Sequence, residues 1–195
     1  MSLSRRDFLK ITALAGAAVG LSAPLVRHFI NQGTLNKISA THYLMGTVVN
    51  FVLIAESKEE VQTALQITIE QMRHLIQIYD HRQLDGPLGQ LNATGTTLHP
   101  PHELVTTLQQ SLRFGALSNG AFDVTIKPIL DALQANHPSV QDLTSLVDYR
   151  LLNVTNDKIT LARPGMAVTL DGIAKGCVID GAAAMLYKLG FENVL

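Results

Sequence analysis

The sequence predicts an α+β fold, in which helices pack against a mainly antiparallel sheet. Two observations lead to this prediction: stretches with helical apolar periodicity alternate with short β-branched stretches, and residues 151–161 turn tightly at Asn156 and Asp157 as a hairpin does. The composition supports a folded core, because 47% of the 195 residues are apolar and 16% are charged. Since Cys177 is the single cysteine, an internal disulfide is impossible and core burial must hold the fold together.

The N-terminus has the pattern of a bacterial export signal. Residues 4–10 read Ser-Arg-Arg-Asp-Phe-Leu-Lys, which matches the twin-arginine signal, and an apolar stretch follows over residues 11–26. We therefore predict that residues 1–30 are a twin-arginine signal peptide or, if uncleaved, an N-terminal anchor in the inner membrane. The protein is expected to be periplasmic, with residues 31–40 as a polar linker to a domain over 41–195.

The first half of that domain predicts one strand and two helices. Residues 41–55 are apolar and β-branched, which favours a strand with a bend at Gly46. Ser57 and Glu60 stand at capping-box spacing before a helix that is expected to end near Tyr79. Its apolar stripe consists of Val61, Leu65, Ile69, Met72, Leu75 and Ile76.

Residues 80–100 contain Asp-Gly-Pro and Ala-Thr-Gly clusters and predict an ordered but irregular loop. Pro101 is expected to open a second helix that stops at Asn119-Gly120. The residues expected to face inward from this helix are Leu104, Leu108, Leu112 and Leu117.

The second half predicts a short helix over 126–135, the hairpin over 151–161 and a sheet strand at 168–170. A last helix is expected over 174–189, stopping at Gly190, and residues 193–195 are expected to begin a further strand. Because a sheet edge is an unusual place for a domain to finish, we interpret the 41–195 domain as truncated.

Two segments in the first half could contact a ligand, and each has a structural alternative. Met45-Gly46-Thr47 could bring a flat ligand close to the backbone beside a thioether, or form a strand bulge with a core methionine. Tyr79-Asp80 ends a helix, where the tyrosine could stack on a ring, or lie at the boundary of the core with an exposed tip.

Two segments in the second half could do the same. Residues 118–125, Ser-Asn-Gly-Ala-Phe-Asp-Val-Thr, would place Ala121, Phe122 and Asp123 on an extended strand, or form a tight turn in which the aspartate makes a local hydrogen bond. Residues 169–176, Thr-Leu-Asp-Gly-Ile-Ala-Lys-Gly, lead into a helix N-terminus that suits a phosphate and has Lys175 beside it. The alternative there is a structural corner capped by Asp171.

Other site classes are disfavoured by the sequence. The net charge is −1 and no basic stripe follows residue 30, which argues against nucleic-acid binding. His99 and His102 flank two prolines, which break the helix that they would need in order to share a metal.

Taken in order, the four segments resemble the ApbE family of FAD:protein FMN transferases, over roughly residues 41–195 and thus over the N-terminal part of its members. The resemblance implies a transferase that moves FMN from FAD, with Mg²⁺, to a threonine hydroxyl of an acceptor flavoprotein subunit in an exported redox complex. By motif, it implies flavin contacts from Met45 and Tyr79, and an FAD pocket lined by Ala121, Phe122 and Asp123. It further implies that Lys175 binds near the diphosphate and that the Gly172 carbonyl binds the metal.

The chain departs from the family pattern at two points. Thr169, assigned to the FAD site, stands where many members have the first aspartate of Asp-Leu-Gly-Gly-Ile-Ala-Lys-Gly, so Asp171 could substitute for it or cap the helix. Members usually continue for another hundred or so residues, with a histidine and an Asp/Thr motif that complete the metal site. No catalytic residue is therefore assigned, and we expect the chain to be inactive alone. The alternatives are a flavin-binding protein that never transfers and an FAD pyrophosphatase.

Overall fold

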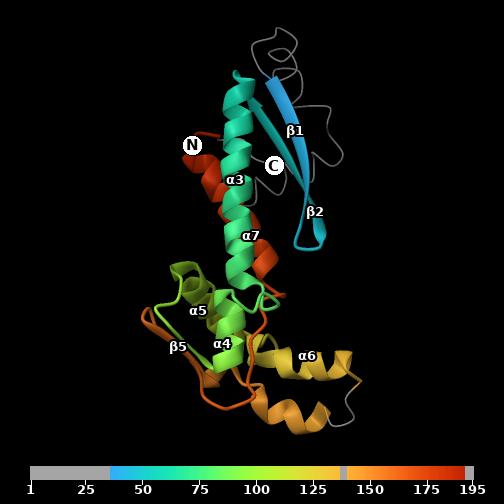
Figure 1. The fold of residues 1–195 in the computed structure, drawn as a ribbon, viewed down its shortest axis with the longest axis vertical. Helices are drawn as coiled ribbons and strands as arrows, with labels where there is room; N and C mark the ends of the chain where they lie inside the picture. The colour runs from blue at the N-terminus through green and yellow to red at the C-terminus, as the bar shows by residue number, and fades with distance from the viewer. Residues whose placement is uncertain (1–35, 137–139, 192–195) are drawn as a thin grey trace.

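A long helix, α3 (Lys58–Tyr79), forms the axis of the upper part of the molecule (Figure 1). The computed structural model describes residues 36–136 and 140–191. Helix α7 (Ala174–Lys188) packs along α3, and a hairpin of β1 (Asn36–Leu44) and β2 (Thr47–Ala55) lies beside them. These elements confirm the predicted α+β class, with helices packed against antiparallel strands.

Helix α3 begins and continues as the sequence predicts. The Ser57 hydroxyl accepts a hydrogen bond from the Glu60 backbone N–H at 3.2 Å, and the acidic side chains of Glu59 and Glu60 lie at the positive end of the helix dipole. The predicted apolar stripe is buried along the helix, apart from a half-buried Ile76, and it continues through Ile78 and Tyr79. Tyr79, the last residue of the helix, therefore lies at the middle of the molecule.

The hairpin corrects two predictions. The single bent strand expected over residues 41–55 is wrong, because Met45 and Gly46 have φ angles of 52° and 70° and reverse the chain as a two-residue hairpin turn. The linker expected over 31–40 is wrong for residues 36–40, which belong to β1. Alternate residues of β1 are half-buried and exposed, and this period of two in a polar segment is the signature of a strand with one covered face.

The lower part contains α4 (Pro87–Thr94), α5 (His102–Leu117) and a small antiparallel sheet of order β3-β5-β4. Its strands are β3 (Thr96–Leu98), β4 (Leu152–Val154) and β5 (Lys158–Leu161), and the last two confirm the predicted hairpin. The loop expected over 80–100 is wrong for 87–98, because Pro87 opens α4 and Gly95, at φ 72°, closes it.

The remaining lower elements are α6 (Lys127–Gln134) and three 3₁₀ segments, η1 (Val124–Ile126), η2 (Val140–Leu146) and η3 (Tyr149–Leu151). Helix α6 confirms the predicted short helix. Residues 118–125 are not an extended strand, because Asn119 and Gly120 adopt positive φ angles and η1 follows. Leu117, expected to face inward, is 70% exposed at the last residue of α5.

Residues 168–170 are buried but do not join the sheet. The Asn92 side chain bonds both backbone groups of Val168, accepting from its N–H at 2.7 Å and donating to its carbonyl at 2.8 Å. A side chain therefore takes the place that a neighbouring strand would have. Helix α7 and its stop at Gly190, where φ is 92°, confirm the last predicted helix, whereas residues 193–195 lie outside the described part of the chain.

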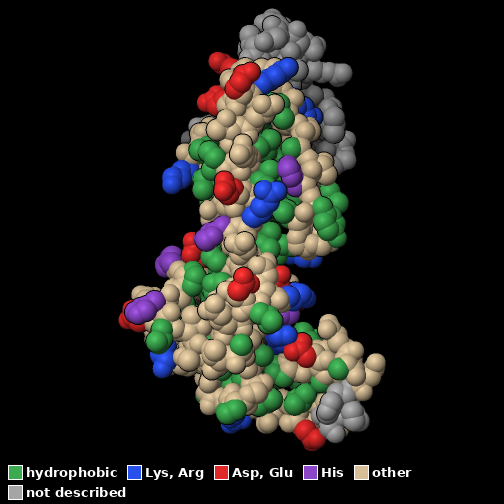
Figure 2. Space-filling view, viewed as in Figure 1, with side chains coloured by type: hydrophobic (Ala, Val, Ile, Leu, Met, Phe, Trp, Pro, Cys, Tyr) green, Lys and Arg blue, Asp and Glu red, His purple; other side chains and the backbone are tan. Residues whose placement is uncertain are grey.

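One apolar core runs through both parts of the molecule and positions the site. It includes Leu53 of the hairpin, Met72 of α3, Leu88 of α4, Leu108 of α5, Ile159 of β5 and Leu186 of α7. At the middle of the molecule, charged side chains of both signs gather beside a hollow between the hairpin and the lower part (Figure 2). Among the described helices, none combines the length and the apolar character needed to cross a bilayer.

Candidate functional site

The hollow contains a cavity of about 470 Å³ that is built from three segments far apart in the sequence. The hairpin turn contributes Met45 and Gly46, and the end of α3 with the loop after it contributes Ile76, Tyr79, Asp80 and Arg82. The segment that leads into α7 contributes Asp171, Ala174 and Lys175. The volume lies within the range usual for sites that bind small organic ligands.

One wall of the cavity is apolar and aromatic. Met45 is carried on the hairpin turn, and Tyr79 is the last residue of α3. The Tyr79 hydroxyl oxygen accepts a hydrogen bond of 3.0 Å from the buried Thr107 hydroxyl, and burial raises the pKa of Tyr79 above its ordinary value. Because the hydroxyl is bonded inside the protein, the ring is what Tyr79 offers to the cavity.

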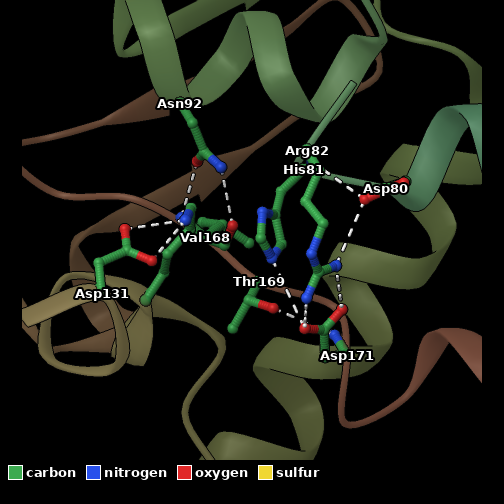
Figure 3. A network of polar contacts seen from close by, with 9 residues as sticks. Asp80, His81, Arg82, Asn92, Asp131, Val168, Thr169 and Asp171 are labelled. Atoms are coloured by element: carbon green, nitrogen blue, oxygen red, sulfur yellow. Dashed lines mark hydrogen bonds and ion pairs between the residues drawn. The ribbon is translucent and has the colours of Figure 1, made fainter. Parts of the chain in front are cut away.

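A second part of the wall is charged. The Arg82 guanidinium donates two hydrogen bonds to the Asp171 carboxylate, at 3.3 and 2.9 Å, and lies 3.4 Å from Asp80 Oδ1 (Figure 3). The His81 ring nitrogen Nε2 lies 3.6 Å from the same Asp171 carboxylate. The hydrogen bond from Arg82 lowers the pKa of Asp171, and burial partly offsets this.

The N-terminus of α7 completes the cavity. The Ala174 N–H is bonded to the Leu170 carbonyl at 2.7 Å, whereas among the described residues no acceptor faces the N–H groups of Lys175 and Gly176. The Lys175 side chain is exposed at the cavity and forms no ion pair with a described residue. Free N–H groups, the helix dipole and an ammonium group together favour an anion here.

Phe122 and Gly172 meet in a neighbouring depression rather than in this cavity. The depression has a volume of about 410 Å³, and a Cβ placed on Gly172 would lie 3.4 Å from the Phe122 ring. Phe122 also packs edge-to-face on Phe114, with ring centroids 6.1 Å apart. Asp171 lines the cavity, and the next residue in the chain, Gly172, lines the depression.

Asp123 lines neither the cavity nor the depression, and its carboxylate forms hydrogen bonds within the protein. One oxygen accepts from the Thr125 N–H and hydroxyl, at 2.8 and 2.6 Å, and the other accepts from the Tyr149 N–H at 2.8 Å. This is the local hydrogen bonding of a tight turn, extended to η3. Ala121 is exposed and is not among the residues that line the cavity.

Thr169 is buried behind the corner instead of facing the cavity. Its hydroxyl accepts a hydrogen bond from the Asp171 N–H at 3.2 Å (Figure 3). Its own N–H donates to the Val124 carbonyl at 2.9 Å. Thr169 therefore fixes the backbone from which Asp171 projects.

The structure thus brings together Met45, Tyr79 and Lys175 from the predicted set, and it adds Arg82 and His81, which sequence reasoning missed. The sequence signal that could have identified them is their position, because Asp80, His81 and Arg82 directly follow Tyr79. A run of charged residues at a helix end usually marks a solvated surface, and only the fold shows that the run faces Asp171.

The described residues do not form a complete magnesium site. Residues 36–136 and 140–191 contain no group of three or more histidine, cysteine or acidic side chains placed to hold a metal ion. The Gly172 carbonyl is a candidate donor, but the neighbouring Asp171 carboxylate is engaged by Arg82. This set does not fit a complete Mg²⁺ centre, which requires near-octahedral oxygen ligands.

Comparison with known families gives two matches. Residues 45–195 match the ApbE family, and residues 2–22 match the signal sequence of the twin-arginine translocation pathway. A comparison with curated protein sequences gave no match.

Several solved structures share the fold. A variant of the flavin transferase ApbE from Vibrio cholerae superposes with a TM-score of 0.73 at 20% identity, over 82% of this chain and 59% of that one. The ApbE protein from Thermotoga maritima gives 0.70 at 18% identity, over 82% and 55%. The apo flavinyl transferase ApbE from Pseudomonas stutzeri gives 0.70 at 19%, over 83% and 53%. The chain therefore spans little more than half the length of these proteins.

Proposed function

Because the chain belongs to the ApbE family, we propose that it binds FAD in the cavity between the hairpin turn and α7 and acts in the transfer of FMN to a protein. The observation that carries this proposal is the meeting of an apolar, aromatic wall with a cationic helix N-terminus. Met45 and Tyr79 belong to the apolar part of the lining, and Lys175 lies at the start of α7. FAD has the same two-part character, with a flat ring system joined to a charged diphosphate.

In this arrangement the flavin ring packs against Met45 and the Tyr79 ring, which offer polarizable and aromatic surface. The diphosphate lies at the start of α7, where the Lys175 ammonium and the free N–H groups neutralise its charge. Phe122 and Gly172 border the ligand from the adjoining depression, and Thr169 contributes by fixing the corner. Asp123 and Ala121 act through the 118–125 turn that carries Phe122.

The reaction that we propose forms a phosphoester between FMN and a threonine hydroxyl of an acceptor protein and releases AMP from FAD. Mg²⁺ supplies charge neutralisation at the diphosphate in such chemistry. Of the described residues, only the Gly172 carbonyl is a candidate ligand for it, and the ion would need further oxygen ligands beside it. What the described residues do without the metal is to bind and orient FAD.

The twin-arginine match at residues 2–22 supports a periplasmic location. We propose that the acceptor is a flavoprotein subunit of an exported redox complex. An uncleaved N-terminus would in addition hold the protein at the inner membrane.

Incubation of a full-length version of the protein with FAD, Mg²⁺ and an acceptor that presents a threonine tests the proposal, since the 195-residue chain alone is expected to be inactive. The expected result is a fluorescent acceptor band that survives denaturing electrophoresis and is lost when the threonine is changed to alanine. Free FMN and AMP without a labelled band would assign a pyrophosphatase instead. Retention of intact FAD without either product would assign a flavin-binding protein.

A titration of the same chain with FAD, followed by flavin fluorescence, addresses the binding step separately. Met45→Ala should weaken binding, whereas Val48→Ala, an exposed change on β2 outside the cavity, should not. Equal affinity of both variants with the unchanged protein would contradict the placement of the ring beside the hairpin turn.

A further inference from the structure

The charges around the cavity are balanced in an unexpected way. Two cationic side chains, Arg82 and Lys175, and two carboxylates, Asp80 and Asp171, line it. Their formal charges cancel, so the side chains of the cavity offer an anionic ligand no net positive charge beyond the partial charge of the α7 N-terminus. A site for a diphosphate would be expected to have an excess of cations.

Asp171 is the carboxylate that occupies the guanidinium group of Arg82. Both of its oxygens accept hydrogen bonds from this group, at 3.3 and 2.9 Å, in the fork geometry that arginine also uses to bind phosphate. The side chains of Asp171 and Arg82 are 53% and 61% exposed. Ion pairs as exposed as this one contribute little to stability, so the need for stability does not explain the pair.

Arg82 is also held at the cavity independently of Asp171. Asp80 Oδ1 accepts a hydrogen bond from the Arg82 backbone N–H at 3.0 Å and lies 3.4 Å from its guanidinium. If the Asp171 carboxylate were displaced, Arg82 would therefore remain at the rim. Asp171 would keep a neighbour in His81, whose Nε2 lies 3.6 Å away.

Building on the function proposed above, we propose that Asp171 is an internal competitor for Arg82 and thereby sets the specificity of the cavity for anionic ligands. A diphosphate entering the cavity displaces the carboxylate and takes over the guanidinium fork, so that Arg82 and Lys175 bind its oxygens together. A ligand must offer Arg82 more negative charge than one carboxylate does. Neutral flavins gain nothing from this exchange and bind through the apolar wall alone.

Calorimetric titration of the full chain with FAD, riboflavin and inorganic pyrophosphate tests the exchange. Asp171→Asn should tighten the binding of FAD and of pyrophosphate by about three- to tenfold and leave riboflavin unchanged. Arg82→Gln should weaken FAD and pyrophosphate, and Arg82→Lys, which keeps the charge without the fork, should fall in between. The matched control is Asp180→Asn, which removes an exposed carboxylate of α7 outside the cavity and should change each affinity by less than about twofold.

Unchanged or weaker pyrophosphate binding in Asp171→Asn would overturn the proposal, as would an equal gain for riboflavin, which would mean a general opening of the cavity. If Asp171→Asn does not fold, Arg82→Gln and Arg82→Lys decide, because a purely structural arginine would leave pyrophosphate affinity unchanged. Pyrophosphate binding that responds to these changes without any flavin binding would refute the proposed function alone. Flavin binding with an affinity that is the same in all the Asp171 and Arg82 variants would refute this inference and leave the proposed function standing.

Discussion

Tyr79 shows how one side chain serves both the interior and the cavity. Its ring lines the cavity, while its hydroxyl accepts a hydrogen bond from Thr107 on α5. Thr107 is 3% exposed, so its hydroxyl has no access to solvent as a substitute partner. The contact therefore links the end of α3 to α5 at the point where the ligand is expected.

Tyr79→Phe should lower the free energy of unfolding by about 1–3 kcal/mol, because the buried Thr107 hydroxyl loses its acceptor. Burial raises the pKa of Tyr79 above 10.0, so both the folded and the unfolded chain are neutral at this side chain below that pH. Above this pH, Tyr79 loses its proton more readily in the unfolded chain than in the folded one. Ionisation therefore favours unfolding of the unchanged protein, whereas Tyr79→Phe has no such proton to lose. The advantage of the unchanged protein over Tyr79→Phe should thus be full at neutral pH and shrink as the pH rises past 10.0.

Urea unfolding of both proteins across this pH range measures the difference. A gap that is constant from neutral to alkaline pH would show that Tyr79 ionises equally easily in both states.

Lys175→Ala should weaken FAD binding by about 10- to 100-fold, because a charge-assisted contact to the diphosphate is lost. Thr169→Ala should weaken it less, since the Thr169 hydroxyl only bonds the Asp171 N–H behind the corner. Lys188→Ala, at the other end of α7, is the control for general charge and should leave the affinity unchanged. Equal losses from Lys175→Ala and Thr169→Ala would contradict the placement of the lysine beside the phosphates.

At the scale of elements, the short helix α4 fixes the loop that carries Arg82. Gly89 of α4 packs against the backbone of this loop: a Cβ placed on Gly89 would overlap the Gln83 carbonyl oxygen and lie 2.9 Å from the Gln83 carbonyl carbon. Only glycine leaves room for this approach. The position of Arg82 therefore depends on a residue seven positions further along the chain.

Gly89→Ala should lower the free energy of unfolding by about 1–3 kcal/mol, since the backbone of the loop must move to remove the clash. It should also weaken pyrophosphate binding, because the loop carries Arg82 away from the rim. Gly176→Ala is a matched control: no heavy atom lies within 4 Å of the position that its new Cβ would take, and stability should be unchanged or higher by up to about 1 kcal/mol. Thermal unfolding measures the stability of the two variants. A Gly89→Ala protein as stable as Gly176→Ala would show that the loop backbone moves to accept the new Cβ at no measurable cost in stability.

The elements differ in how well the sequence predicts them. Helix α3 is predictable because its cap at Ser57 and its apolar stripe are local properties of the sequence. The turn at Met45 is not, because a methionine with positive φ gives no turn signal and a continuous apolar stretch resembles one strand. Residues 168–170 have the composition of a strand, yet the partner that they find is the side chain of Asn92.

In the site, too, the features with a local sequence signal are predictable and those that depend on tertiary packing are not. Motifs predict Met45, Tyr79 and Lys175, and the fold brings these residues to one cavity. The pairing of Arg82 with Asp171 spans 89 positions and has no local pattern, so it depends on how α3 and α7 pack. The motif assigns Asp123 to the FAD pocket, but whether its oxygens can also serve a ligand depends on Thr125 and Tyr149, which already bond them.

At the scale of the whole molecule, the chain combines an export signal with a cavity whose walls come from both ends of the folded part. The hairpin turn at residue 45 and the helix start at residue 174 are brought together only when the upper part has formed. A cofactor bound there before export requires a route that accepts folded proteins, and the twin-arginine match supplies one.

Changing Arg5 and Arg6 together to lysine should abolish export almost completely, because the pathway recognises the arginine pair rather than charge alone. Arg27→Lys, which lies outside the motif, should leave export unchanged. Cell fractionation followed by immunoblotting reports the location. Periplasmic protein in equal amounts from both variants would mean that another signal directs the chain.

The left-handed backbone at Met45 has a consequence for evolution at this position. A residue with a Cβ is disfavoured at φ 52°, by roughly 1–2 kcal/mol, and asparagine or glycine would relieve this strain. Met45→Asn should therefore give a hairpin that resists denaturation better while losing the thioether surface that faces the cavity. A methionine at this position therefore costs stability, which is the trade-off expected where a side chain serves a ligand contact and not the turn that it makes.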